Sequence, residues 1–179
     1  MPFTPYHFGP AGLIGLVFKR RVDLPVFLLA NVAIDIEVLI IYGLGLGWPH
    51  HRLCHTFLGG AVVGIAVAAV CFPLRGVFKK VMELFHLAYN TTFLKMLIWS
   101  ILGVWLHVFI DAMDHWDVKP FWPYGKNPLW SANGGLNDYQ IKMVCLICWV
   151  AALALLAIHL ARHNMQDTRH KTQDPRRKT

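Results

Sequence analysis

The pair His107 and Asp111 is the strongest chemical feature of the chain, because the two residues lie one helical turn apart in a long apolar segment. Side chains at i and i+4 share one face of a helix, and an imidazole beside a carboxylate is a frequent pair of metal ligands. An ionisable group in a membrane-grade apolar segment costs about 3 kcal/mol unless something compensates it. The pair therefore predicts a buried functional site.

Other histidines and carboxylates occur in the neighbouring apolar segments. Asp35 and Glu37 are two residues apart, so on a regular helix their side chains point about 200° from each other and cannot face one metal ion. Asp35 is the expected ligand and Glu37 the expected ion-pair or supporting residue, and either could accept a proton during catalysis. His55 begins the next apolar segment on the same side. Residues that could be additional or supporting ligands are Asn31, His51 and His115.

His7 precedes an apolar run, residues 8–18, that is too short to cross a bilayer. As a helix this run is about 16 Å long, which is half the thickness of the hydrocarbon core. We expect a half-helix that begins at a site in the outer half of the membrane and ends at Lys19, Arg20 and Arg21 on the cytoplasmic side. This geometry would bring His7 within reach of the metal.

The composition places the chain among membrane proteins, with 56% hydrophobic and only 15% charged residues. Four segments have the length of about 20 residues that a spanning helix needs: 24–46, 55–74, 94–112 and 141–161. The predicted fold is all-α, an integral membrane helical bundle of four spanning helices plus the short N-terminal half-helix. Residues 1–161 are expected to form one membrane-embedded domain, and residues 162–179 a basic disordered tail.

The basic residues predict the orientation of the bundle in the membrane. If the C-terminal tail is cytoplasmic and four spans are threaded, most Lys and Arg residues fall on the cytoplasmic side, as the positive-inside rule requires. The exceptions are Arg52, Lys119, Lys126 and Lys142. The predicted metal site then opens on the extracytoplasmic side of a prokaryotic cell membrane. A tail that contacts anionic lipid or nucleic acid is the less favoured reading, and no specific nucleic acid is expected.

The segment 113–140 is too long for a simple connection and too rich in aromatic residues for disorder. We expect either an ordered lid over the outer face of the bundle, beside His107 and Asp111, or an interfacial anchor of Trp and Tyr side chains. In a lid, Lys119 or Lys126 could bind a substrate phosphate.

Four segments in this order, MPFTPYHFGP, NVAIDIE, HHRLCHTFLG and WLHVFIDAMDHWDVKPFWP, resemble the membrane-bound metal-dependent hydrolases of prokaryotes. A more distant likeness connects the chain with zinc-dependent phospholipase C and the single-strand nucleases of the same all-helical fold. That likeness implies a cluster of one to three zinc ions, with Asp111 bridging two of them. The ligands it implies are His7, Asp35, His55, His107 and Asp111.

The function expected from the residues and the resemblance is metal-dependent hydrolysis, with zinc as the expected metal. A site beneath an aromatic lid favours a phosphoester in a membrane lipid or a lipid-linked small molecule as substrate. Two alternatives stay open: a divalent-cation transporter, which would need ligands in both halves of the bilayer, and a non-catalytic membrane protein whose helices a structural metal holds together.

Overall fold

The computed structural model describes residues 4–45, 53–130 and 135–173 of the chain, with side chains as far as residue 169. All regular structure in these ranges is helical, which confirms the all-α prediction. The elements are, in order, η1 (Thr4–Tyr6), α1 (Phe8–Val17), α2 (Leu24–Ala33), α3 (Asp35–Gly43), α4 (Phe57–Cys71), η2 (Phe72–Leu74), α5 (Arg75–Leu84), α6 (Phe93–Asp114) and α7 (Asp138–Gln173).

Four helical stretches are long and apolar enough to cross a membrane: Leu24–Gly43, Phe57–Leu84, Phe93–Asp114 and Asp138–Arg169. α1 is apolar but has only 10 residues, as expected of a non-spanning helix. The predicted bundle of four spans and one short N-terminal helix is therefore confirmed. The division into one domain, residues 1–161, and a tail stays a prediction, and α7 continues as one helix past residue 161 to Gln173.

Local sequence signals fix where the central helices begin. Thr56 precedes α4, and its hydroxyl oxygen accepts a hydrogen bond from the Gly59 backbone N–H at 2.8 Å. Thr92 caps α6 in the same way, accepting from the Lys95 N–H at 3.2 Å. A side-chain cap stabilises a helix start by about 1 kcal/mol. These two caps set the register of the helix that carries His107 and of the turn that carries His55.

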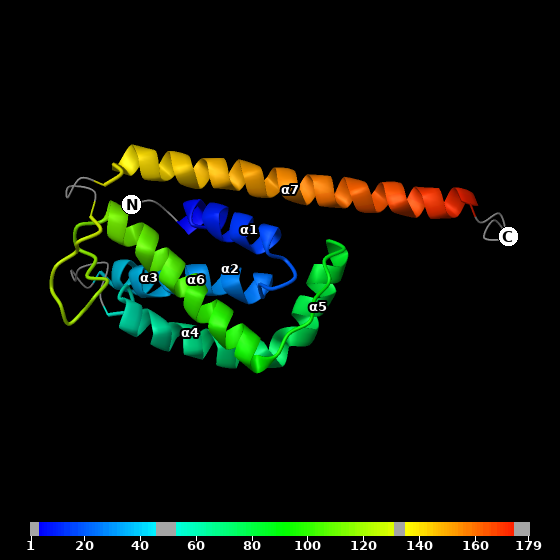
Figure 1. Cartoon of the computed structure of the whole chain (residues 1–179). Helices are drawn as coiled ribbons and strands as arrows, with labels where there is room; N and C mark the ends of the chain where they lie inside the picture. Colours follow the sequence, from blue (N-terminus) through cyan, green and yellow to red (C-terminus); the bar gives the residue numbers. More distant parts are fainter. Residues whose placement is uncertain (1–3, 46–52, 131–134, 174–179) are drawn as a thin grey trace.

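α6 is the central helix of the bundle and packs against both α2 and α4 (Figure 1). Two glycines permit the close approach. A Cβ atom at Gly103 would lie 2.5 Å from the Phe27 carbonyl oxygen, and one at Gly64 would lie 2.8 Å from the Ile101 Cα atom. The Ser100 hydroxyl donates to the Gly64 carbonyl at 2.8 Å. α6 is thereby held at a fixed depth between its neighbours.

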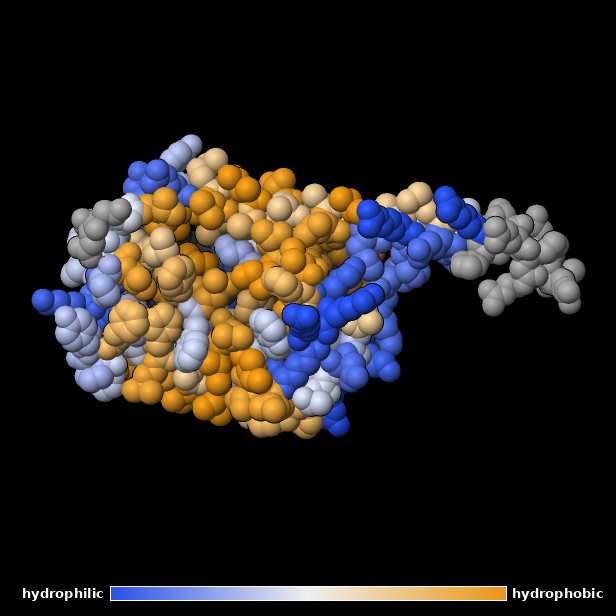
Figure 2. Space-filling model, in the orientation of Figure 1, coloured by the Kyte–Doolittle hydropathy of each residue, from blue (hydrophilic) through white to orange (hydrophobic). Residues whose placement is uncertain are grey.

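The face of the bundle in Figure 2 has a broad apolar belt between two hydrophilic ends. Large apolar side chains on several helices are exposed, among them Leu39, Val62 and Ile147. Such a surface is expected of a protein whose solvent is the hydrocarbon of a bilayer.

The two ends of the bundle differ in charge. The α1–α2 junction, α5, the start of α6 and the end of α7 lie at one end, and they contain the basic residues predicted to be cytoplasmic (Figure 1). The end of α6, the start of α7 and the connection between them lie at the other end. The separation is that which the positive-inside rule predicts, and the compartment on each side stays a prediction.

Candidate metal centre

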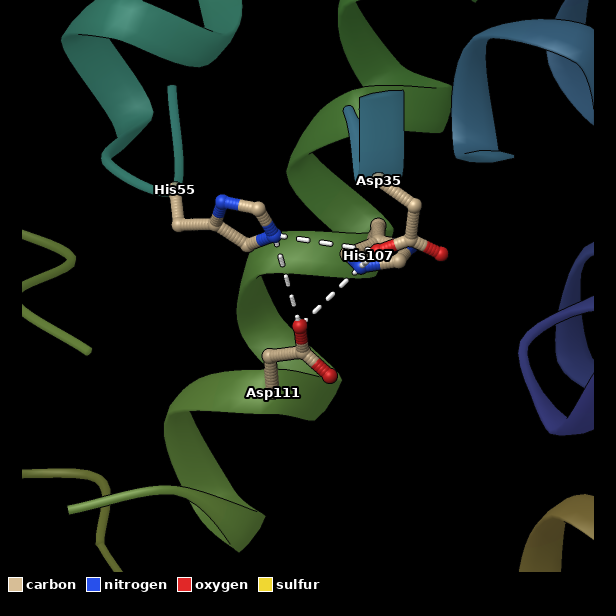
Figure 3. Close-up of side chains that lie close together, drawn as sticks. All are labelled: Asp35, His55, His107 and Asp111. Carbon is tan, nitrogen blue, oxygen red and sulfur yellow. Dashed lines mark hydrogen bonds and ion pairs between the residues drawn. The ribbon is translucent and has the colours of Figure 1, made fainter. Parts of the chain in front are cut away.

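Four predicted ligands meet at one point near the less basic end of the bundle. Asp35, His55, His107 and Asp111 each offer one ligand atom, and these atoms all lie within 4.8 Å of one another. Figure 3 shows that they come from three different elements and point toward a common centre. Both histidines are fully buried, and Asp111 is 3% exposed. This cluster could bind a metal ion.

Each element positions its ligand by a local feature of the backbone. His107 and Asp111 lie one turn apart near the end of α6, as the sequence predicted. His55 lies in the turn before α4, directly ahead of the capping residue Thr56. Asp35 is the first residue of α3 and follows a break in the first span at Ile34. There the Ile34 N–H donates to the Val32 carbonyl, and the Ile34 carbonyl accepts from the Glu37 N–H at 3.1 Å.

The distances within the cluster suit a tetrahedral cation. His107 Nε2 lies 3.0 Å from Asp111 Oδ2 and 3.2 Å from Asp35 Oδ1. His55 Nε2 lies 3.7 Å from Asp111 Oδ2 and 3.8 Å from Asp35 Oδ1. Ligands about 2.05 Å from a zinc ion at tetrahedral angles are about 3.4 Å apart, so these four His–Asp distances bracket the required value, and every pair of ligand atoms lies within 4.8 Å. The donor set also fits, because a divalent cation would neutralise the carboxylates of buried Asp111 and partly exposed Asp35.

Glu37 lies behind His55, on the side away from the common centre. Its Oε2 atom is 3.1 Å from His55 Nδ1. A ligating histidine usually donates its second ring N–H to a carboxylate or carbonyl, which fixes the tautomer and the orientation of the ring. His55 therefore has the arrangement of a supported ligand, whereas His107 Nδ1 has no hydrogen-bond partner among the described residues.

His7 adjoins the cluster without sharing its centre. Its Nε2 atom is 3.0 Å from Asp111 Oδ1, which is the carboxylate oxygen that faces away from the other ligands. The His7 ring stacks on the ring of His107, with centroids 4.1 Å apart. α1 thus brings His7 into contact with Asp111, whose other oxygen belongs to the four-residue centre.

The remaining predicted site residues lie outside the four-residue centre. The Asn31 side chain is buried and donates to the Gly103 carbonyl at 3.1 Å, so it joins α2 to α6. His115 follows the end of α6, and its Nε2 atom is 3.7 Å from Asp114 Oδ2. Lys119 and Lys126 are exposed in the segment after α6. His51 lies outside the described residues.

Sequence reasoning treated Cys54 only as a small apolar residue, yet it borders the cluster beside His55. Burial and the neighbouring Glu37 carboxylate raise the pKa of the Cys54 thiol to about 11. Without a metal ion the thiol is protonated at neutral pH, and a protonated thiol is a poor nucleophile. No spacing in the sequence indicates this contact, because Glu37 and Cys54 belong to different segments of the chain.

The described part of the segment after α6 packs against the same end of the bundle as the cluster. Asn127 donates to the Ala112 carbonyl at 2.8 Å and to the His115 carbonyl at 3.1 Å, next to the end of α6. The Phe57 N–H donates to the Pro120 carbonyl at 2.8 Å. The segment is therefore tied to the end of α6 and to the start of α4, next to the turn that carries His55.

Fold and site together define an all-helical integral membrane protein with a buried His/Asp cluster. Residues 7–171 match the model of the YdjM inner membrane protein family, and the chain belongs to this family. No curated protein and no solved structure matches the chain. The family establishes a membrane protein of prokaryotic type, and its description includes neither hydrolysis nor a likeness to phospholipase C.

Proposed function

We propose that this protein is a membrane-bound, metal-dependent hydrolase that uses zinc and cleaves a phosphoester in a lipid or lipid-linked substrate. The observation that carries the proposal is the convergence of Asp35, His55, His107 and Asp111 on one centre. Within the resemblance stated above, His7 would hold a further ion together with the second oxygen of Asp111, which it contacts at 3.0 Å.

Access to the centre supports a membrane-embedded substrate. The buried side is formed by the His55 and His107 side chains, which are 0% exposed, whereas the Asp35 and Glu37 side chains are 19% and 17% exposed. A cavity of about 790 Å³ between α2, α3 and α4 extends to Glu37 and Cys54. Its wall is otherwise apolar, with residues such as Ile36 and Val67, and it would admit the acyl or isoprenyl part of a lipid.

The roles of the residues follow from this geometry. A bound zinc ion would lower the pKa of its water toward about 7 and so supply hydroxide at neutral pH. Glu37 holds the His55 ring in place through Nδ1. Asp35, on the accessible side, is the group best placed to accept a proton, with Glu37 as its alternative. Lys119 and Lys126, which are exposed at the same end of the bundle, would attract the phosphate.

One observation favours a second candidate, a structural metal that holds the helices together. Four protein ligands complete a tetrahedral shell, whereas catalytic zinc sites usually have three protein ligands and one open position. For hydrolysis, one carboxylate must therefore leave the ion, or the ion must accept a fifth ligand.

The decisive experiment measures metal content and turnover on the same full-length protein in detergent. Zinc would be counted by mass spectrometry, and hydrolysis would be measured on phospholipid micelles and on a generic phosphodiester. The test variant is His107→Ala. The matched control is Phe109→Ala, which truncates an exposed side chain on the same helix.

The proposal expects zinc and turnover in the unmodified protein, loss of both in His107→Ala and retention of both in Phe109→Ala. Zinc without turnover on either substrate would contradict hydrolysis and favour the structural metal. A protein that binds no zinc would contradict both.

A further inference from the structure

A second group of histidines lies at the basic end of the bundle, away from the candidate metal centre. Lys19 Nζ, at the end of α1, is 2.9 Å from His159 Nδ1 on α7. His159 Nε2 is 3.0 Å from the backbone carbonyl oxygen of His86, just after α5. The His86 ring stacks on the ring of His163, with centroids 3.7 Å apart. We call Lys19, His86, His159 and His163 the basic cluster.

The hydrogen bonds of the basic cluster fix which atoms donate and which accept. An ammonium group has three donors and no acceptor, so Lys19 donates to His159 Nδ1. His159 Nε2–H then donates to the His86 carbonyl. Lys19 keeps two further N–H donors for an anion.

The acidic residue closest in sequence is occupied elsewhere. Asp23, fully buried, accepts hydrogen bonds from Tyr89 and from Thr91. Burial and the Asp23 carboxylate raise the pKa of Tyr89 above its usual value, so that its hydroxyl keeps the proton that it donates. No carboxylate among the described residues forms an ion pair with Lys19.

His86 occupies a backbone position that glycine would fill more readily. Its φ angle is 54°, and it follows α5 in the arrangement that commonly ends a helix. The Leu87 N–H donates to the Met82 carbonyl at 2.9 Å, and the His86 N–H donates to the Glu83 carbonyl at 2.9 Å. Glycine is the usual residue here, because a Cβ atom is unfavourable at positive φ. Histidine in place of glycine at this position therefore lowers the local conformational stability.

An apolar cavity of about 490 Å³ lies near the basic cluster, and sequence neighbours of the cluster residues, not the cluster residues themselves, line it. It lies between α1, α2, α7 and the segment from α5 to Leu87. Leu16, Phe85 and Leu156 line it, and each is within three residues of a member of the basic cluster. The volume is within the range of about 300–1,000 Å³ that is usual for small-molecule sites. Figure 1 shows α1 beside α7, with α5 reaching toward them at this end.

We propose that this cavity and the basic cluster form a binding site for an anionic phospholipid, with an acyl chain in the cavity and the phosphate on Lys19 and the histidine rings. The site is formed by α1, α2, α5 and α7, and it is separate from the centre on α3 and α6. The positive charge of Lys19 favours a lipid with a net negative charge over a zwitterionic lipid. The neighbouring Arg20 and Arg21 increase the local positive potential.

The test measures lipid binding by the full-length protein in a neutral detergent, by native mass spectrometry. Dioleoyl-phosphatidylglycerol, dioleoyl-phosphatidylcholine and inorganic phosphate are titrated separately and in competition. Lys19→Gln removes the central cation. Lys80→Gln is the matched control, since it removes the same charge from an exposed residue of α5 at the same end. Gly12→Leu fills the cavity from α1, where a Cβ atom makes only an ordinary contact with Ala152 Cβ at 3.5 Å.

The proposal expects phosphatidylglycerol to bind at least tenfold more tightly than phosphatidylcholine. Lys19→Gln and Gly12→Leu should each weaken that binding about tenfold, and Lys80→Gln should leave it unchanged. Equal weakening by Lys19→Gln and Lys80→Gln would overturn the proposal in favour of diffuse surface charge. Competition by millimolar inorganic phosphate would overturn it in favour of a soluble anion. Unchanged zinc content in each variant shows that the fold is intact.

Discussion

Histidines gather at both ends of this bundle, but their partners are opposite in charge. At the candidate metal centre, His55 and His107 face carboxylate oxygens at 3.0–3.8 Å. At the basic cluster, His159 contacts an ammonium group at 2.9 Å and a backbone carbonyl at 3.0 Å. The first environment attracts a cation, and the second attracts an anion.

The comparison shows that the residue type alone does not decide the chemistry of a histidine. An imidazole nitrogen is a metal ligand when its lone pair faces a site rich in negative charge. The same ring holds an ammonium group or a phosphate when its neighbours are donors or cations. The two ends should therefore respond differently to substitution, and four predictions test the difference.

The largest expected effect is on metal binding by Asp111→Asn. Asp111 contacts His55 and His107 through one oxygen and His7 through the other. The substitution removes one of four ligands and its charge. If each ligand contributes a quarter of the binding free energy of a typical structural zinc site, the loss is about 3 kcal/mol, so zinc affinity should fall about 100-fold. Zinc titration with a competing chelator measures the change. Asp167→Asn, on the distant part of α7, is the control, and an equal loss in both variants would remove the distinction between the ends.

The second largest effect is a loss of stability expected for Gly103→Ala. The new Cβ atom would meet the Phe27 carbonyl oxygen at 2.5 Å and so push α6 away from α2. Overpacking of this kind costs about 1–3 kcal/mol and should also lower zinc content, since α6 carries two ligands. Thermal unfolding in detergent measures it. Gly43→Ala, where nothing lies within 4 Å of the added atom, should leave stability unchanged, and equal effects would refute the close contact.

Glu37→Gln should have a moderate effect on the metal centre and none at the basic cluster. The amide still reaches His55 Nδ1, at 3.1 Å in the unmodified protein, but without the charge that increases the basicity of the ligand. Loss of such a supporting carboxylate usually reduces metal affinity about 10–100-fold. The same zinc titration applies, with Glu83→Gln on exposed α5 as control. Unchanged zinc affinity would show that Glu37 does not support His55 as a metal ligand.

The smallest effect is expected at the opposite end, for His86→Gly against His86→Ala. Both remove the ring, but only glycine relieves the positive φ of 54°. The free energy of unfolding of the His86→Gly variant should therefore exceed that of the His86→Ala variant by about 1 kcal/mol in lipid-free detergent. Chemical unfolding measures the difference, and zinc content should stay constant in both. A less stable glycine variant would show that position 86 does not need the left-handed conformation.

The sequence predicted the parts of the fold that depend on local patterns. The length of each apolar segment predicted the spans, and the shortness of the first one predicted α1. The spacing of His107 and Asp111 predicted a shared face, because a helix has a fixed period. The end of α7 depends less on such patterns, since the charged residues beyond Ala161, where α7 continues to Gln173, are as compatible with a helix as with a tail.

The candidate site could be predicted only in part, for reasons that lie in the backbone. Asp35 and Glu37 both follow the break at Ile34 and lie two residues apart in α3, so their side chains diverge as a regular helix requires. Both carboxylates nevertheless reach His55, on its two different nitrogens, because the turn before α4 places that ring between them. No periodicity in the sequence indicates where that turn lies relative to α3.

From the amino acids alone follow a helical membrane bundle, its basic end and a pair of ligands on one helix, since these depend on hydrophobicity and helical period. Tertiary structure decided which distant residues meet. The approach of α6 to α2 and α4 through Gly103 and Gly64 brings three elements to one centre, and the contact of α7 with α1 places His159 beside Lys19, 140 residues away. Such meetings depend on packing between helices, which the local sequence of each helix does not determine.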